Sequence, residues 1–194
     1  MKITVSLILL FLLSACAQAV VGSVSKSVLV SKEERSVGTF IDDTVIIAKL
    51  KNIYFSQNEK IFFNVDIEVS EGRVLLTGTV ESSDIRIEAT RLAWGVDQVQ
   101  TVINEIQISN TDSILDFADD LVITTKIKAK LLLDKNINNL NFSIDTVNRV
   151  VYVIGIAQNN NELDKVIEII NGVFGVEEVI NYVRLKEELI SNES

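Results

Sequence analysis

Hydrophobic positions between residues 42 and 185 follow two periods. Ile46, Leu50 and Ile53 recur at the three- to four-residue spacing of an amphipathic helix, whereas apolar and polar residues alternate in Asn64–Val69 as they do in a strand. Continued along the chain, this pattern predicts the order helix, strand, strand, helix, strand. A strand–helix–strand connection is right-handed, so the second and third strands should be parallel, with both helices on one face of the sheet.

The same order is predicted twice, because the chain contains an internal repeat. Shifting the sequence by 77 residues aligns Asp42–Ile108 with Asp119–Leu185 without a gap and gives 16 identities in 67 positions. The identities concentrate at glycines and branched apolar residues, which suits two copies of one structural unit. The predicted fold class is α+β, with two tandem αββαβ units, each a three-stranded mixed sheet covered by two helices. The linker is short, so the two units should pack against each other.

Individual elements follow from this pattern. Paired aspartates, Asp42-Asp43 and Asp119-Asp120, are expected to cap the first helix of each unit. A polar turn should separate that helix from the first strand in the first unit. The predicted strands are Asn64–Val69, Arg73–Val80, Val99–Ile108, Phe142–Thr146, Val150–Ala157 and Val179–Leu185, and the predicted second-unit helices are Phe117–Leu133 and Glu162–Ile170.

The N-terminal residues have a different pattern. Lys2 precedes an apolar run from Ile3 to Leu13, which has the length of a signal peptide and is too short to span a bilayer. The following Leu13-Ser14-Ala15-Cys16 resembles the lipobox of bacterial lipoproteins. That resemblance implies removal of residues 1–15 and a covalent lipid on Cys16, the only cysteine; an ordinary secretory signal with an incidental Cys16 is the alternative.

The expected organisation follows from these segments. Residues 16–41 form a lipidated N-terminus and tether, 42–108 the first unit, 109–117 a linker, 118–185 the second unit and 186–194 a flexible tail.

Composition narrows the possible functions. The net charge of -9 repels nucleic acid at long range, so no nucleic-acid partner is expected. The chain has no histidine, which excludes Ser-His-Asp and Cys-His catalysis and histidine-ligated metal sites. We therefore expect no enzyme activity, no bound metal and no cofactor beyond the covalent lipid on Cys16. The two aspartate pairs need no metal to explain them, and Gly78 and Gly155 more readily indicate close backbone approach than a phosphate site.

The motifs within the repeat resemble the BON domain (bacterial OsmY and nodulation). The strand motif is Val74-Leu75-Leu76-Thr77-Gly78 in the first unit and Val151-Tyr152-Val153-Ile154-Gly155 in the second. The closing motif is Gly175-Val176-Glu177-Glu178-Val179-Ile180-Asn181, and Gln98 replaces its glycine in the first unit. With the lipobox, the chain resembles dual-BON outer-membrane lipoproteins. This resemblance implies a non-enzymatic protein on the periplasmic face of the outer membrane that binds phospholipid and supports envelope integrity; Ala17, where Asp would favour inner-membrane retention, agrees with that location.

One helix offers a candidate lipid-binding surface. Residues 121–133 carry surplus apolar positions opposite the expected core stripe, flanked by lysines that could reach lipid headgroups. The candidate residues are Leu121, Val122, Lys126, Lys128, Ala129, Lys130, Leu132 and Leu133. The expected partner is a phospholipid membrane, anionic lipids included. Two alternatives stay open: the face is buried against the first unit, or the protein is a stress-response adaptor that docks envelope proteins and uses its lipid only as a tether.

Overall fold

The computed structural model describes residues 37–109 and 114–188. All of them belong to one compact unit. The first repeat contains α3 (Val37–Gln57), α4 (Glu59–Asn64), β1 (Val65–Ser70), β2 (Arg73–Val80), α5 (Ser83–Trp94), β3 (Thr101–Asn104) and β4 (Gln107–Ile108). The second contains α6 (Ile114–Leu133), the 3-10 turn η2 (Asn139–Asn141), β5 (Phe142–Val147), β6 (Val150–Ala157), α7 (Asn160–Asn171) and β7 (Glu178–Leu185). The predicted α+β fold class is confirmed.

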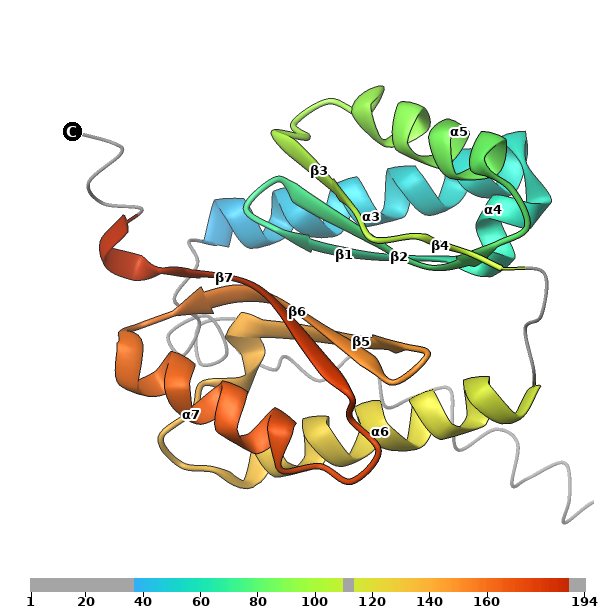
Figure 1. Cartoon of the computed structure of the whole chain (residues 1–194). Coiled ribbons are helices and arrows are strands. Elements are labelled where there is room, and N and C mark those ends of the chain that lie inside the picture. Colours follow the sequence, from blue (N-terminus) through green and yellow to red (C-terminus); the bar gives the residue numbers. More distant parts are fainter. Residues whose placement is uncertain (1–36, 110–113, 189–194) are drawn as a thin grey trace, which may run out of the picture. The chain divides into compact units, whose positions relative to one another are not determined.

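Each repeat folds around a mixed sheet. In the first, β1 is antiparallel to β2 and β2 is parallel to β3; in the second, β5 is antiparallel to β6 and β6 is parallel to β7. Within each repeat, the two long helices lie on the same side of the sheet (Figure 1). The predicted parallel pairing and helix placement are therefore confirmed.

The third strand of the first repeat differs from the prediction, because it is broken. β3 pairs with the start of β2 and β4 pairs with its end, so both lie along one edge. At the break, Asn104 Oδ1 accepts a hydrogen bond from the Ile106 backbone N–H at 3.1 Å, and Ile106 is 1% exposed. The break thus turns Ile106 into the core, whereas β7 runs uninterrupted over eight residues.

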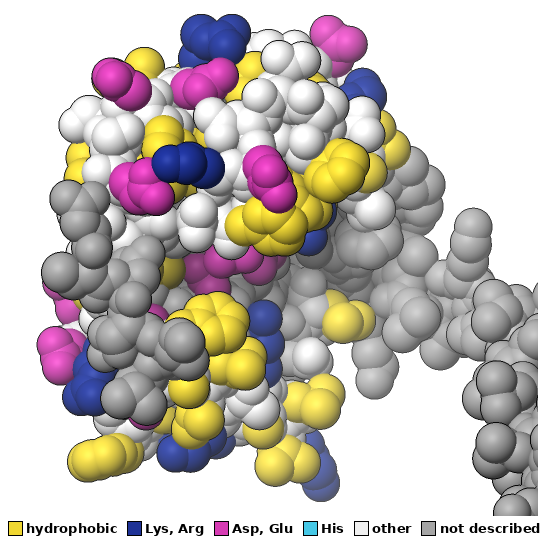
Figure 2. Space-filling view, turned by 90° about the vertical axis from the view of Figure 1, so that its right-hand side faces the viewer, with side chains coloured by type: hydrophobic (Ala, Val, Ile, Leu, Met, Phe, Trp, Pro, Cys, Tyr) yellow, Lys and Arg dark blue, Asp and Glu magenta, His cyan; other side chains and the backbone are white. Residues whose placement is uncertain are grey.

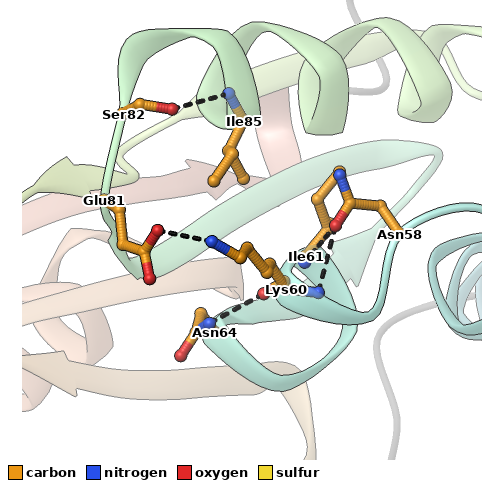
Figure 3. Close-up of polar contacts among 7 residues, drawn as sticks. All are labelled: Asn58, Lys60, Ile61, Asn64, Glu81, Ser82 and Ile85. Carbon is orange, nitrogen blue, oxygen red and sulfur yellow. Dashed lines mark hydrogen bonds and ion pairs between the residues drawn. The ribbon is translucent and has the colours of Figure 1, made fainter.

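The predicted polar turn before β1 is wrong, because the helix α4 occupies it. The Asn58 side chain caps α4 by accepting hydrogen bonds from the backbone N–H groups of Lys60 and Ile61. Ile61 is fully buried, and Lys60 forms an ion pair with Glu81 at 2.6 Å (Figure 3). The Asn58 cap and the packing of Ile61 and half-buried Phe62 on the core stabilise this short helix.

The aspartate pairs do not cap helices, contrary to the prediction. α3 begins at Val37 and α6 at Ile114, so the end of the predicted tether and of the predicted linker is helical. Asp43 and Asp120 are 3% and 8% exposed and lie inside these helices. Each carboxylate accepts two hydrogen bonds from a β-hairpin turn: Asp43 from the N–H groups of Glu71 and Gly72 at 2.8 Å, and Asp120 from Asn148 and Arg149 at 2.7 and 2.8 Å.

These bonds fix an unfavourable turn geometry. Both central residues of each turn have positive φ, 55° and 69° at Glu71 and Gly72 and 50° and 65° at Asn148 and Arg149. This is the geometry of a type I′ hairpin turn, which Asn and Gly adopt readily and Arg does not. The buried carboxylate therefore joins the long helix to the hairpin of the same repeat and holds the turn in place.

Three hydrophobic clusters hold the described residues together. One lies between helices and sheet in each repeat, centred on Leu50 in the first and Ile127 in the second. The third joins β2 to the second sheet through Leu75, Tyr152 and Ile154. Polar contacts surround the third cluster: Thr77 Oγ1 donates to Asp145 Oδ2 at 2.5 Å, and the Arg73 guanidinium donates to the Tyr182 carbonyl at 2.9 Å. The prediction that the two units pack together is confirmed, and both faces of β2 and β6 are buried.

Gly78 and Gly155 allow close backbone approach, as expected. A Cβ at Gly78 would lie 2.1 Å from the Asn64 carbonyl oxygen, and one at Gly155 would lie 2.0 Å from that of Asn141. Any side chain at these positions would force β1 and β2, or β5 and β6, apart.

Several predicted features lie outside the described residues. They are the signal peptide 1–15, the lipidation site Cys16, most of the tether and the last six residues of the tail. Lys186–Glu188, at the start of the predicted flexible tail, are helical. None of the helices in the part of the chain that the structure describes has the length and hydropathy needed to cross a membrane.

The aspartate–turn contacts predict a position-specific loss of stability. Asp43→Ala or Asp120→Ala leaves two backbone N–H groups without their acceptor, so each should lower the free energy of unfolding by about 2 kcal/mol. Urea denaturation followed by circular dichroism measures this loss. Asp42→Ala, at an exposed neighbouring position, is the control and should cost less than about 0.5 kcal/mol. If Asp42→Ala and Asp43→Ala lower the free energy of unfolding equally, the hydrogen bonds that Asp43 accepts from the turn do not stabilise the fold.

Candidate functional site

The core contacts of α6 determine which of its side chains face solvent. Asp120 is held by the hairpin turn, and Ile123, Ile127 and Leu131 are 3%, 0% and 2% exposed in the core. All eight predicted lipid-binding residues are exposed on the other side. We call them the outer face of α6: Leu121, Val122, Lys126, Lys128, Ala129, Lys130, Leu132 and Leu133.

The outer face is an apolar stripe bordered by lysines. Leu121, Val122, Leu132 and Leu133 have exposed fractions of 56%, 49%, 66% and 80%. At about 100° per residue, these side chains and Ala129 fall within an arc of roughly 120°. Exposed Thr125 lies in the same arc, between Val122 and Ala129 along the helix. Lys128 lies at one border, and Lys126 and Lys130 lie at the other. Figure 2 shows hydrophobic side chains beside Lys and Arg side chains on one surface of the protein.

Acidic groups at both ends of α6 are engaged elsewhere. Asp119 forms an ion pair with Arg149 at 2.9 Å, and Asp134 forms one with Lys165 at 2.8 Å. The Lys165 ammonium also holds the pKa of Asp134 below its usual value. The charge presented by the outer face itself is therefore positive, although the whole chain is acidic.

Phe117 belongs to this surface but was not predicted as part of it. It is 70% exposed and lies one helical turn before Leu121, so it extends the apolar stripe towards the start of α6. The i, i+4 spacing was visible in the sequence. The signal was missed because the helix was expected to begin at Phe117 itself, whereas α6 begins at Ile114.

The corresponding helix of the first repeat is more polar, as the sequence predicts. On α3 the equivalent positions include Thr44, Asn52 and Ser56, all exposed. Phe55, the equivalent of Leu132, is 65% exposed and contacts Phe62 edge to face at a centroid distance of 5.2 Å. Trp94, the only tryptophan, ends α5 and is 54% exposed.

A cleft of about 600 Å³ lies beside the outer face, lined by residues of both repeats. Leu121 and Lys128 of α6 line it, together with Asp66 and Glu68 of β1 and Asp145 of β5. Burial raises the pKa of all three carboxyl groups, and Lys128 opposes the rise in each. Lys128 is thus the counterion of a buried acidic cluster as well as a border residue of the outer face.

The described residues offer no obvious reactive chemistry. No group of three or more His, Cys, Asp or Glu side chains within them is placed to hold a metal ion. The surface combines exposed apolar side chains with lysine ammonium groups.

Comparison with known families identifies the repeat. The BON domain profile matches residues 42–110 and again 119–187, which together cover most of the chain. The chain therefore belongs to the BON domain family.

Three relatives match over most of their length. A protein of Anaplasma centrale from the gshII 5' region is 46% identical over 147 residues, which cover 75% of this chain and 96% of that protein. The outer membrane lipoprotein DolP of Haemophilus influenzae is 30% identical over 87% of both chains. The osmotically-inducible protein Y of Escherichia coli is 29% identical over 81% of this chain and 79% of that protein.

The acidic cluster predicts a stability that depends on pH. A carboxyl group with a raised pKa in the folded state favours folding when protonated, so this contribution is lost as pH rises through the raised pKa. Glu68→Gln removes one of the three charges and should raise the thermal unfolding midpoint at neutral pH. The gain should shrink as the pH falls through the raised pKa of Glu68, because the wild-type carboxyl group then becomes protonated in the folded state. If Glu68→Gln instead lowers the unfolding midpoint by the same amount at neutral and at acidic pH, the pKa of Glu68 is not raised in the folded state.

Proposed function

We propose that this protein is a non-enzymatic envelope lipoprotein that binds anionic phospholipid membrane through the outer face of α6 and supports outer-membrane integrity. The observation that carries the proposal is the exposure of Leu121, Leu132 and Leu133, which form an apolar stripe between lysines. Large apolar side chains exposed together on one helix face typically mark an interaction site.

The chemistry of the stripe favours a membrane as its occupant. An interfacial helix inserts its apolar face at the boundary between headgroups and acyl chains, while lysines at its borders extend their ammonium groups to the headgroups. Lys126, Lys128 and Lys130 are all exposed and placed for this. Each lysine near an anionic surface contributes roughly 1 kcal/mol, so Lys126 and Lys130 give about 2 kcal/mol before any apolar insertion. Lys128 adds less, because it also faces the carboxyl groups of the cleft.

Such a contact is weak alone and sufficient together with an anchor. A covalent lipid on Cys16 would hold the protein at the membrane and raise the local concentration of the outer face near the bilayer. The name of the H. influenzae relative, an outer membrane lipoprotein, supports the same location for this chain. The anchor then provides attachment, and the outer face of α6 provides orientation on an anionic surface.

The adaptor alternative has less support. An outer face buried between the two repeats would leave no surface for lipid and would favour the adaptor. The large aliphatic side chains of the outer face are instead at least 49% exposed: Leu121, Val122, Leu132 and Leu133.

The two repeats supply matched variants for a test. Lys126→Gln removes one charge from the outer face, and Lys49→Gln removes the same charge from the equivalent exposed position of α3. The chain from residue 16 onward with Cys16→Ser carries no lipid, so its binding reports the protein surface alone. In co-sedimentation with phosphatidylglycerol–phosphatidylcholine vesicles, Lys126→Gln should weaken binding roughly fivefold and Lys49→Gln should have no effect.

A second pair tests the apolar part. Leu132→Asp should abolish binding, whereas Phe55→Asp, at the equivalent and equally exposed position, should leave it unchanged. If wild type does not bind anionic vesicles, or if Leu132→Asp combined with Lys130→Glu binds as wild type does, α6 is not a membrane site.

A further inference from the structure

The loop between α7 and β7 carries the most exposed large hydrophobic side chain among the described residues. Phe174 is 93% exposed, although its neighbour Val173 is only 4% exposed and packs in the core of the second repeat. The loop backbone is fastened on both sides of Phe174: Val173 N–H donates to the Ile170 carbonyl at 3.1 Å, and Val176 N–H donates to the Val173 carbonyl at 3.2 Å. The fold therefore holds Phe174 out into solvent.

This loop lies directly against α6. A Cβ at Gly175 would be 3.0 Å from Cδ1 of Ile123, and Nζ of Lys130 donates to the Gly172 carbonyl at 3.3 Å. Gly172 and Gly175 lie on either side of Phe174 in the sequence. Their contact residues on α6, Lys130 and Ile123, are two helical turns apart. Both fall on the side of the helix where Lys126 and Lys130 border the outer face. The lysines thus have the apolar stripe on one side and the Phe174 loop on the other.

The first repeat shows that the fold does not require an aromatic residue here. Its equivalent loop has the same form, with Val96 6% exposed and Val99 N–H donating to the Val96 carbonyl at 3.3 Å. Gln98 there has a φ of 74°, and its equivalent Gly175 has 102°. The position equivalent to Phe174 is occupied by Asp97, which is exposed.

We propose that Phe174 is a second membrane-inserting residue, which enters the headgroup region of an anionic phospholipid bilayer together with the outer face of α6. This inference rests on the proposed function. A stripe on one helix leaves the protein free to roll about the helix axis on the membrane. An apolar anchor beyond the lysine border restricts that rotation and places Lys126 and Lys130 between two inserted groups, at the level of the headgroup phosphates.

Tryptophan fluorescence can test the insertion directly, using the Cys16→Ser chain. Wild type has a single tryptophan, Trp94 in the first repeat, so its emission is the internal control. In a chain that carries Trp94→Phe and Phe174→Trp together, emission should shift to the blue on addition of phosphatidylglycerol–phosphatidylcholine vesicles, and brominated acyl chains should quench it. Trp94 in the otherwise wild-type chain should show neither change.

A binding measurement complements the fluorescence. Phe174→Ser should weaken vesicle binding about tenfold, because it removes an inserted aromatic ring, while Trp94→Ser should not. Both side chains are exposed, so the thermal unfolding midpoints should stay close to that of wild type.

The outcomes separate this inference from the proposed function. If wild type does not bind the vesicles, the proposed function fails and this inference fails with it. If wild type binds and Lys126→Gln weakens binding, the proposed function stands and only the role of Phe174 is in question. That role is wrong if Phe174→Ser binds vesicles as wild type does, or if the emission of the Phe174→Trp chain does not shift.

Discussion

Asp43 and Asp120 each bring a buried carboxylate to the turn of a β-hairpin, and the position of the long helices depends on this contact. Asp120 accepts two backbone hydrogen bonds at 2.7 and 2.8 Å, so α6 can neither slide along the sheet nor rotate on it without losing both. Asp120 faces the same side of the helix as Ile127 and Leu131. Fixing this side towards the sheet leaves Leu121, Ala129 and Leu132 facing solvent. The same bonds that stabilise the turn therefore determine which side chains α6 can offer to a membrane.

The aspartate–turn contact is present in both repeats, whereas the exposed faces of the two long helices differ. α3 and α6 are held alike, but α3 presents Thr44, Asn52 and Ser56 where α6 presents Leu121, Ala129 and Leu133. The loop after the second helix differs in the same direction, with Asp97 in one repeat and Phe174 in the other. The two elements of the second repeat that carry these apolar side chains are joined by the hydrogen bond from Lys130 to the Gly172 carbonyl. The two repeats thus share a scaffold and differ in the surface that it presents.

The sequence predicted what hydrophobic period and repetition can encode. β2 and β6 were predicted with their observed bounds, and the 77-residue repeat predicted two copies of one topology. Helical periodicity also separated the eight outer-face residues of α6 from Ile123, Ile127 and Leu131. It left open whether that face is exposed or buried against the first repeat, because this depends on tertiary packing. The aspartates were misassigned because a helix cap and a buried acceptor for a distant turn have the same local sequence. Their partners, such as Gly72 and Arg149, are nearly 30 residues away.

Phe117 and Phe174 escaped prediction for related reasons. Phe117 joins the stripe only because α6 begins three residues earlier, at Ile114, than the periodicity indicated. Phe174 is close to α6 only through tertiary contacts with Ile123 and Lys130, which no local period reveals. The helix α4 was missed because its capping residue, Asn58, also suits a turn.

The central claim is that the second repeat alone meets the membrane, through surfaces that the aspartate–turn contact orients. Backbone amide NMR of the Cys16→Ser chain with phosphatidylglycerol-containing micelles that carry a paramagnetic lipid tests it most directly. The account predicts that signals from the outer face of α6 and from residues 172–175 broaden, while those from α3 and α5 keep their intensity. Broadening of the α3 signals as strong as that of the α6 signals would contradict the account. So would an absence of broadening in α6 and residues 172–175.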